Sequence, residues 1–165
     1  DDMKIINKNN KKSLIFRELN IPDIKKYMLI VYHSVTEEFQ DTEKNLNIFL
    51  NSIEKINLPK LWILPNNDPG SGIIKQNIFK RRDSKTLLFD NLNREKYLYI
   101  LKNAACIVGN SSSGIIEAPT YKIPAVNIGR RQHKRLRAKN VIDIKIHDDC
   151  RYTVRELTPI DEFHR

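Results

Sequence analysis

The sequence predicts an α/β three-layer sandwich, in which parallel strands form a central sheet and helices cover both of its faces. Three observations predict this class. The chain has 165 residues, a length that suits one domain. Short, continuous apolar runs indicate strands that are buried on both faces. Segments with apolar residues at helical spacing separate these runs, and alternating strands and helices form parallel sheets with right-handed crossovers.

The apolar runs define the predicted strands. The first run, from Met28 to Tyr32, is continuous and has no alternation of apolar and polar residues. Such a run is typical of a central strand in a parallel sheet. About six strands are expected, at residues 28–32, 60–64, 86–89, 105–108, 125–128 and 141–144.

Helical spacing between these runs predicts the covering layers. Apolar side chains recur every three or four residues from Leu46 to Ile53, which predicts an amphipathic helix with Asp41 as its N-cap. A short helix capped by Ser13 is expected before the first strand. The other helices are expected at residues 73–81 and 94–103, and from about residue 113.

The expected domain organisation has three parts. Residues 1–25 are predicted to be a linker with a short helix, residues 26–150 the α/β domain, and residues 151–165 a tail with a truncated terminal helix region. The chain opens on Asp1 and Asp2 without an initiator Met, and no signal peptide follows. We therefore expect a piece of a longer protein.

Composition excludes several classes of protein. Cys106 and Cys150 are the only cysteines, too few for a disulfide-stapled mini-protein. No apolar run approaches the roughly 20 residues that a membrane-spanning helix needs. No His, Cys or carboxylate cluster has metal-ligand spacing. We therefore expect a cytoplasmic protein that has no membrane partner, metal or cofactor.

The charge predicts an anionic partner. Lys and Arg number 29 against 20 Asp and Glu, a net charge of +9. Such a balance attracts nucleic acid, acidic lipid or a phosphorylated small molecule. Residues 130–139 hold six basic residues and no acid, and form either a solvated surface or a phosphate site. No aromatic residues interleave with this run, which disfavours nucleic acid.

Polar segments follow five of the predicted strands. In a parallel sheet the carboxyl ends of the strands share one edge, and ligands bind in the crevice along it. Loops that converge there predict a small-molecule site. The segments are His33, residues 65–72, Asn91, residues 109–119 and residues 129–131.

The segment GNSSSG, at residues 109–114, is the most informative of these. A Gly/Ser loop that enters a helix offers free backbone N–H groups, hydroxyls and a helix dipole to a phosphate. Alternatively, Ser112 or Ser113 only caps the helix. A Walker A motif and a GxGxxG fingerprint are absent. Glu117 follows in the helix and either complements the dipole or accepts a pair of ribose hydroxyls.

Other polar residues at this edge have two interpretations each. His33 is either a structural histidine or a site residue that donates to phosphate or assists proton transfer. Arg131 either pairs with a diphosphate or lies in water. Asn66 either contributes to the site or only forms an Asx turn before the Pro-Gly pair at residues 69–70. Cys106 is expected in the core as an inert thiol.

These loops, in this order, resemble the UDP-N-acetylglucosamine 2-epimerases, and most closely the hydrolysing branch of sialic-acid and related nonulosonic-acid synthesis. The resemblance implies half of a GT-B fold, namely its Rossmann-like C-terminal domain. The N-terminal domain is not matched, and a homo-oligomeric whole protein is expected. The motifs are YHSVTEE (32–38), PNNDPGSG (65–72), GNSSSGIIEAP (109–119) and IPAVNIGRRQ (123–132).

The resemblance also implies a site for UDP or a UDP-sugar. Two serines hold the diphosphate, a glutamate holds the ribose, and a histidine near the diphosphate is needed for activity. An asparagine and an arginine line the nucleotide site, and the loop near Asn93 and Arg94 lies by the uracil. The serines match Ser111 and Ser112, the glutamate matches Glu117, and the histidine matches His33, which is implied to be catalytic. The asparagine matches Asn66 and the arginine matches Arg131.

The implied reaction removes the proton at sugar C2, eliminates UDP to give a glycal, and adds water to give N-acetylmannosamine. The acids that move protons belong mainly to the N-terminal domain, so this chain alone is expected to bind UDP weakly and to turn over nothing. Arg130 and Lys134 depart from the family pattern and add positive charge. Two alternatives stay open: a GT-B glycosyltransferase domain, and a basic nucleic-acid-binding module.

Overall fold

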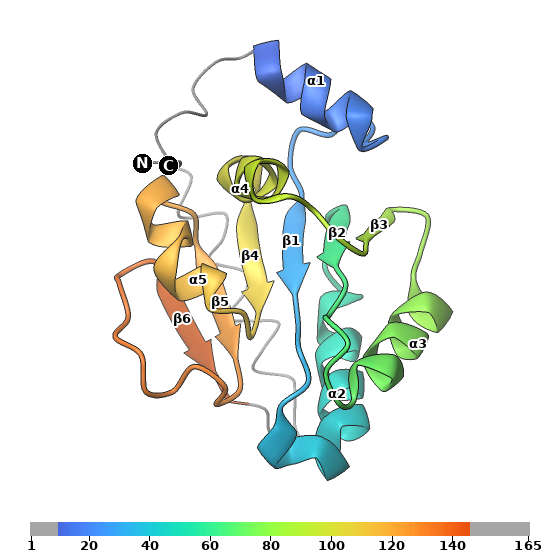
Figure 1. Ribbon diagram of the computed structural model, residues 1–165, viewed down its shortest axis with the longest axis vertical. Coiled ribbons are helices and arrows are strands. Elements are labelled where there is room, and N and C mark those ends of the chain that lie inside the picture. Colours follow the sequence, from blue (N-terminus) through green and yellow to red (C-terminus); the bar gives the residue numbers. More distant parts are fainter. Residues whose placement is uncertain (1–9, 146–165) are drawn as a thin grey trace.

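A computed structural model describes residues 10–145 and contains one six-stranded sheet in the order β3-β2-β1-β4-β5-β6 (Figure 1). Every neighbouring pair of strands is parallel. The predicted α/β class and its six strands are therefore confirmed. The strands are β1 (Met28–Val31), β2 (Lys60–Ile63), β3 (Thr86–Phe89), β4 (Cys106–Gly109), β5 (Ala125–Ile128) and β6 (Val141–Ile144).

The strand order reverses beside β1. The chain first builds outward from β1 to β3, then crosses back to place β4 on the other side of β1 and builds outward again to β6. The carboxyl ends of β1 and β4 therefore diverge into loops on opposite sides. Such a switch point is where open α/β sheets bind their ligands.

Helices cover both faces of the sheet (Figure 1). One face packs against α2 (Thr42–Ile53) and α3 (Ser71–Arg81), and the other against α1 (Asn10–Glu18) and α4 (Arg94–Asn103). The short elements η2 (Thr36–Asp41), α5 (Ser113–Ile116) and η3 (Ala118–Tyr121) lie in the loops after β1 and β4. The predicted helices are thus confirmed, whereas the two 3-10 helices were not foreseen.

Each central strand supplies both cores. Met28 and Ile30 pack with the side chains of α2 and α3, whereas Leu29 and Val31 pack with those of α1 and α4. Successive side chains of a strand point to opposite faces, so a strand covered on both faces must be apolar throughout. This requirement explains why the run at β1 shows no alternation.

Two predicted helix caps differ from the structure. The first helix begins at Asn10, so Ser13 lies inside it and the predicted cap is wrong. Burial of Ile15 and Phe16 against the core stabilises this helix through packing, so it does not depend on a cap. Asp41 does occupy the N-cap position of α2, but its side chain makes no capping bond. The Thr42 N–H instead donates to the Phe39 carbonyl, because η2 runs directly into α2.

Two further expectations concern the ends of the chain and the membrane. The tail expected at residues 151–165 lies outside the described residues. Within residues 10–145, no helix combines the length and apolar character needed to cross a bilayer.

Candidate functional site

The close approach of β1 and β4 at their carboxyl ends depends on Gly109. Its φ is +141°, in a region that L side chains rarely adopt, and a Cβ built on it would lie 2.0 Å from the Val31 carbonyl oxygen. Glycine therefore lets the end of β4 run directly against β1. The next N–H, from Asn110, donates to the same Val31 oxygen at 3.1 Å.

Asn110 joins three loops. Its Oδ1 accepts the backbone N–H of His33 at 2.7 Å, and its Nδ2 donates to the His33 carbonyl at 2.8 Å. Its own carbonyl accepts from Arg131 Nη1 and from Gln132 Nε2, both at 3.2 Å. Sequence reasoning missed Asn110, although a buried amide directly after a strand and inside a Gly/Ser loop is a usable signal.

The structure places His33 directly after β1, as predicted, and half-buried. Burial lowers its pKa below the ordinary value of 6.5, and the nearby Arg131 guanidinium lowers the pKa further, while Asp68 opposes them. The imidazole is therefore neutral at pH 7. A neutral ring has one nitrogen that donates a hydrogen bond and one that accepts, which suits contact with a ligand that exchanges protons.

The serine loop lies beside Asn110. Ser111 Oγ accepts the N–H of Ser113 at 3.2 Å, and Ser112 occupies the N-cap position of α5 without a side-chain capping bond. The alternative in which the Ser112 side chain caps the helix is therefore wrong. Because α5 is a single turn of four residues, its helix dipole is small.

Glu117 follows α5 and is already paired. Its carboxylate accepts from Arg94 Nη1 at 2.9 Å, and 13% of its side chain is exposed against 57% for Arg94. Arg94 comes from the first turn of α4, so this pair links α4 to the loop after β4. The contact joins one Arg94 nitrogen to a single carboxylate oxygen, Oε1.

Tyr97 of α4 is a second residue that sequence reasoning missed. Burial raises its pKa to about 12, while the hydroxyls of Ser113 and Ser111 lower it. The Tyr97 hydroxyl therefore lies near the serine loop, although it is buried without a hydrogen-bond partner among the described residues. Tyr97 precedes the buried run at residues 98–101 of α4, and a core tyrosine and a site tyrosine share that pattern.

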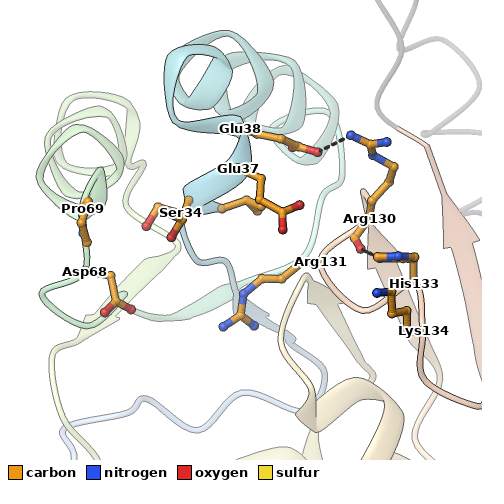
Figure 2. A pocket seen from close by; sticks show the side chains of 11 residues that line it. Ser34, Glu37, Glu38, Asp68, Pro69, Arg130, Arg131, His133 and Lys134 are labelled. Carbon is orange, nitrogen blue, oxygen red and sulfur yellow. Dashed lines mark hydrogen bonds and ion pairs between the residues drawn. The ribbon is translucent and has the colours of Figure 1, made fainter.

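A cavity of about 700 Å³ opens at the carboxyl edge of the sheet, between the loops after β1, β2 and β5. Figure 2 shows carboxylates from η2 and from the loop after β2 facing cations from the loop after β5. Arg131 is the predicted site residue that lines it, and both departures from the family pattern, Arg130 and Lys134, line it too. Its charged side chains are Glu37, Glu38, Asp68, Arg130, Arg131 and Lys134.

Two predicted loop residues lie farther out. Asn66 is exposed and does not line the cavity, although Asp68 of the same loop does. Asn91 is exposed after β3, which is the outermost strand and lies two strands from β1. The cavity is thus lined by the loops after β1, β2 and β5, whereas Asn91 and the predicted residues His33, Ser111, Ser112 and Glu117 do not line it.

The basic run at residues 130–139 folds back on the sheet. Arg137 donates to both Asp143 carboxylate oxygens, at 2.9 and 3.1 Å, and to the Gln132 carbonyl. Arg130 donates to Glu38 at 3.3 Å. Hydrogen bonds from Arg137 lower the pKa of Asp143. Arg130 and Arg137 are thus paired with carboxylates, and Arg137 also shapes the loop.

The Arg130–Glu38 pair is expected to contribute little to folding. The Arg130 side chain is 77% exposed, and exposed ion pairs usually contribute under about 1 kcal/mol. We expect Arg130→Ala to lower the free energy of unfolding by less than Arg137→Ala, measured by urea denaturation. Arg137 is the matched control because its side chain is more buried and closes the loop onto β6. Equal losses for the two variants would contradict this ranking.

Comparison with known proteins gives the family. A family model described as UDP-N-acetylglucosamine 2-epimerase matches residues 1–157. The chain belongs to this family. Among its epimerase relatives, a hydrolysing GDP/UDP-N,N'-diacetylbacillosamine 2-epimerase of Campylobacter jejuni is 36% identical over 151 residues, 89% of this chain. A hydrolysing UDP-N,N'-diacetylbacillosamine 2-epimerase of Legionella pneumophila is 34% identical over 130 residues, 78% of this chain.

A solved epimerase shares the fold. The UDP-GlcNAc 2-epimerase of Neisseria meningitidis, bound to UDP-GlcNAc, matches 99% of this chain with a TM-score of 0.73 and 11% identity. The chain spans 44% of that structure, and 38% and 34% of the Campylobacter and Legionella relatives. The sheet therefore corresponds to one Rossmann-like half of a GT-B fold, as the motifs implied.

Within the described residues, no group of three or more His, Cys, Asp or Glu side chains could hold a metal ion.

Proposed function

We propose that this chain is the UDP-binding domain of a hydrolysing UDP-sugar 2-epimerase. The observation that carries the proposal is the junction at the ends of β1 and β4, where Asn110 brings His33, the serine loop and Arg131 together. A cation, hydroxyls and a neutral imidazole at one switch point suit a nucleotide diphosphate. Membership of the epimerase family supports the same ligand.

The proposed contacts assign each residue a part of UDP. Ser111, Ser112 and Arg131 bind the diphosphate through hydroxyls and a guanidinium, and Glu117 accepts the ribose hydroxyls. His33 lies near the diphosphate, where the N–H of its neutral ring donates a hydrogen bond to a phosphate oxygen as UDP leaves the sugar. Asn66 contributes to the nucleotide site from the loop after β2.

The proposed substrate is a UDP-linked 2-acetamido sugar, with UDP-N-acetylglucosamine as the first candidate. The reaction removes the C2 proton, eliminates UDP and adds water, which gives N-acetylmannosamine and UDP. The Campylobacter and Legionella relatives are named for diacetylated sugars, so the N-acetyl group is the feature shared with this candidate. A role in sialic-acid or related synthesis is part of this proposal.

We expect the 165-residue chain to bind UDP without turnover. The relatives are more than twice as long as their match to this chain, and the acids for proton transfer at C2 are expected in that remaining part. Without them the reaction lacks positioned proton donors and acceptors, which together supply large factors in rate.

Calorimetric titration with UDP tests binding, and an assay for released UDP tests turnover. We expect weak binding that Arg131→Ala abolishes and Arg135→Ala retains, because Arg135 is exposed in the same loop and does not line the cavity. UDP-N-acetylglucosamine is expected to remain intact. No binding at about 10 mM UDP, where even a contact of about −3 kcal/mol is detectable, would contradict the proposal.

The two alternatives give different products or ligands. A GT-B glycosyltransferase would transfer the sugar to an acceptor, whereas the epimerase releases free N-acetylmannosamine, so product analysis of the whole protein separates them. A nucleic-acid module would bind oligonucleotides with a steep salt dependence. We expect UDP binding and no oligonucleotide binding.

A further inference from the structure

We propose that Asn110 is a positioning residue, which holds His33 and Arg131 in a set relation to each other across the mouth of the site. The inference rests on the proposed function for its effect on UDP, and on the ligand-free structure for its geometry. Asn110 is itself 1% exposed and does not line the cavity, so it acts through the residues that it holds.

The Asn110 side chain makes two hydrogen bonds to the backbone of His33. One side-chain amide accepts from the His33 N–H and donates to the His33 carbonyl, so both backbone polar groups of a single residue are hydrogen-bonded to it. This pair of bonds fixes the peptide planes on either side of His33 and therefore the direction of its side chain. A carboxylate of the same size lacks the donor, and a hydroxyl makes only one of the two bonds.

The backbone of Asn110 also binds the loop after β5. The Asn110 carbonyl accepts from Arg131 Nη1 and from the buried Gln132 Nε2. The Asn110 N–H is anchored on Val31 of β1, so the whole residue is fixed to the sheet. Every polar group of Asn110 is thus engaged, and its contacts reach residues 77 positions before it and 21 and 22 after it.

The pKa of His33 depends on this arrangement. Its pKa is lowered by burial and by Arg131, and raised by Asp68. These are the charged groups that face the ring from the neighbouring loops. If Asn110 positions His33 against Arg131, then loss of the amide lets the ring move toward water and away from the guanidinium. The His33 pKa then rises toward 6.5.

The test compares Asn110→Ala with Asn140→Ala in the 165-residue chain. Asn140 is a matched control because its Nδ2 also donates to a backbone carbonyl, that of Ile123 at 2.9 Å, but before β5 and β6 at the opposite edge of the sheet. The His33 ring is titrated by NMR without ligand and assigned with a His33→Gln variant. UDP affinity is then measured by calorimetry.

We expect Asn110→Ala to raise the His33 pKa and to weaken UDP binding about tenfold, the effect of losing roughly one charge-assisted hydrogen bond. Asn140→Ala is expected to leave both quantities at wild-type values. Asn110→Ser is the second variant if Asn110→Ala does not fold, because it is neutral and keeps a polar group beside His33. It should shift both quantities in the same direction by smaller amounts.

The outcomes separate the two claims. A His33 pKa in Asn110→Ala or Asn110→Ser that matches Asn140→Ala would overturn the positioning role. Absence of UDP binding by the wild-type chain would refute the proposed function instead, and the ligand-free titration would still decide the role of Asn110.

Discussion

Gly109→Ala is expected to abolish stable folding of this chain. The φ of +141° disfavours any L side chain, at a cost of about 1–3 kcal/mol. The added Cβ would also lie 2.0 Å from the Val31 oxygen, so β1 and β4 must separate. These two central strands carry both cores, and we expect a loss of at least about 4 kcal/mol, measured by urea denaturation.

Gly72→Ala is the matched control for this result. Gly72 lies in the first turn of α3, its φ is not in the left-handed region, and a Cβ there meets nothing within 4 Å. The same substitution should therefore stabilise the chain by up to about 1 kcal/mol, because alanine reduces the entropy of the unfolded state. Equal behaviour of the two variants would show that close approach at Gly109 does not govern stability.

Glu117→Gln is expected to weaken UDP binding by at least about tenfold, the largest effect on ligand among the surface carboxylates. A carboxylate accepts two ribose hydroxyls in charge-assisted bonds, whereas an amide presents one acceptor and one donor. Replacement also loses the charge that pairs with Arg94. Calorimetric titration with UDP measures the change in affinity.

Glu54→Gln controls for the loss of an ion pair as such. Glu54 accepts from Arg81 at 2.7 Å between α2 and α3, and it follows α2 beside the amino ends of the strands. This variant should leave UDP affinity unchanged. If both glutamine variants weaken UDP equally, the effect would be one of general charge, and Glu117 would lose its proposed role at the ribose.

Much of the fold follows from local patterns. The run at β1 is apolar at every position because both faces are covered, and the amphipathic spacing of α2 follows from its single buried face. The caps were less predictable. Ser13 lies inside α1 because tertiary packing of Ile15 and Phe16 outweighs the small preference of one residue for an N-cap.

The candidate site was only partly predictable. His33 and Arg131 follow strands at the shared edge, so their approach follows from parallel topology. The pairing of Glu117 with Arg94 and the contact of Tyr97 with the serine loop depend on how α4 lies against the loop after β4. Nothing in the spacing of these residues specifies that contact.

The sequence by itself determined the six parallel strands, the covering helices and the edge on which the site forms, because strand burial and helix amphipathicity are local properties. Only the tertiary structure decided that Asn110 forms hydrogen bonds with His33 and Arg131, and that Gly109 lies close against the backbone of Val31. Hydrogen bonds and close approaches between residues 21 to 78 positions apart arise from strand order and register, and no local pattern records them.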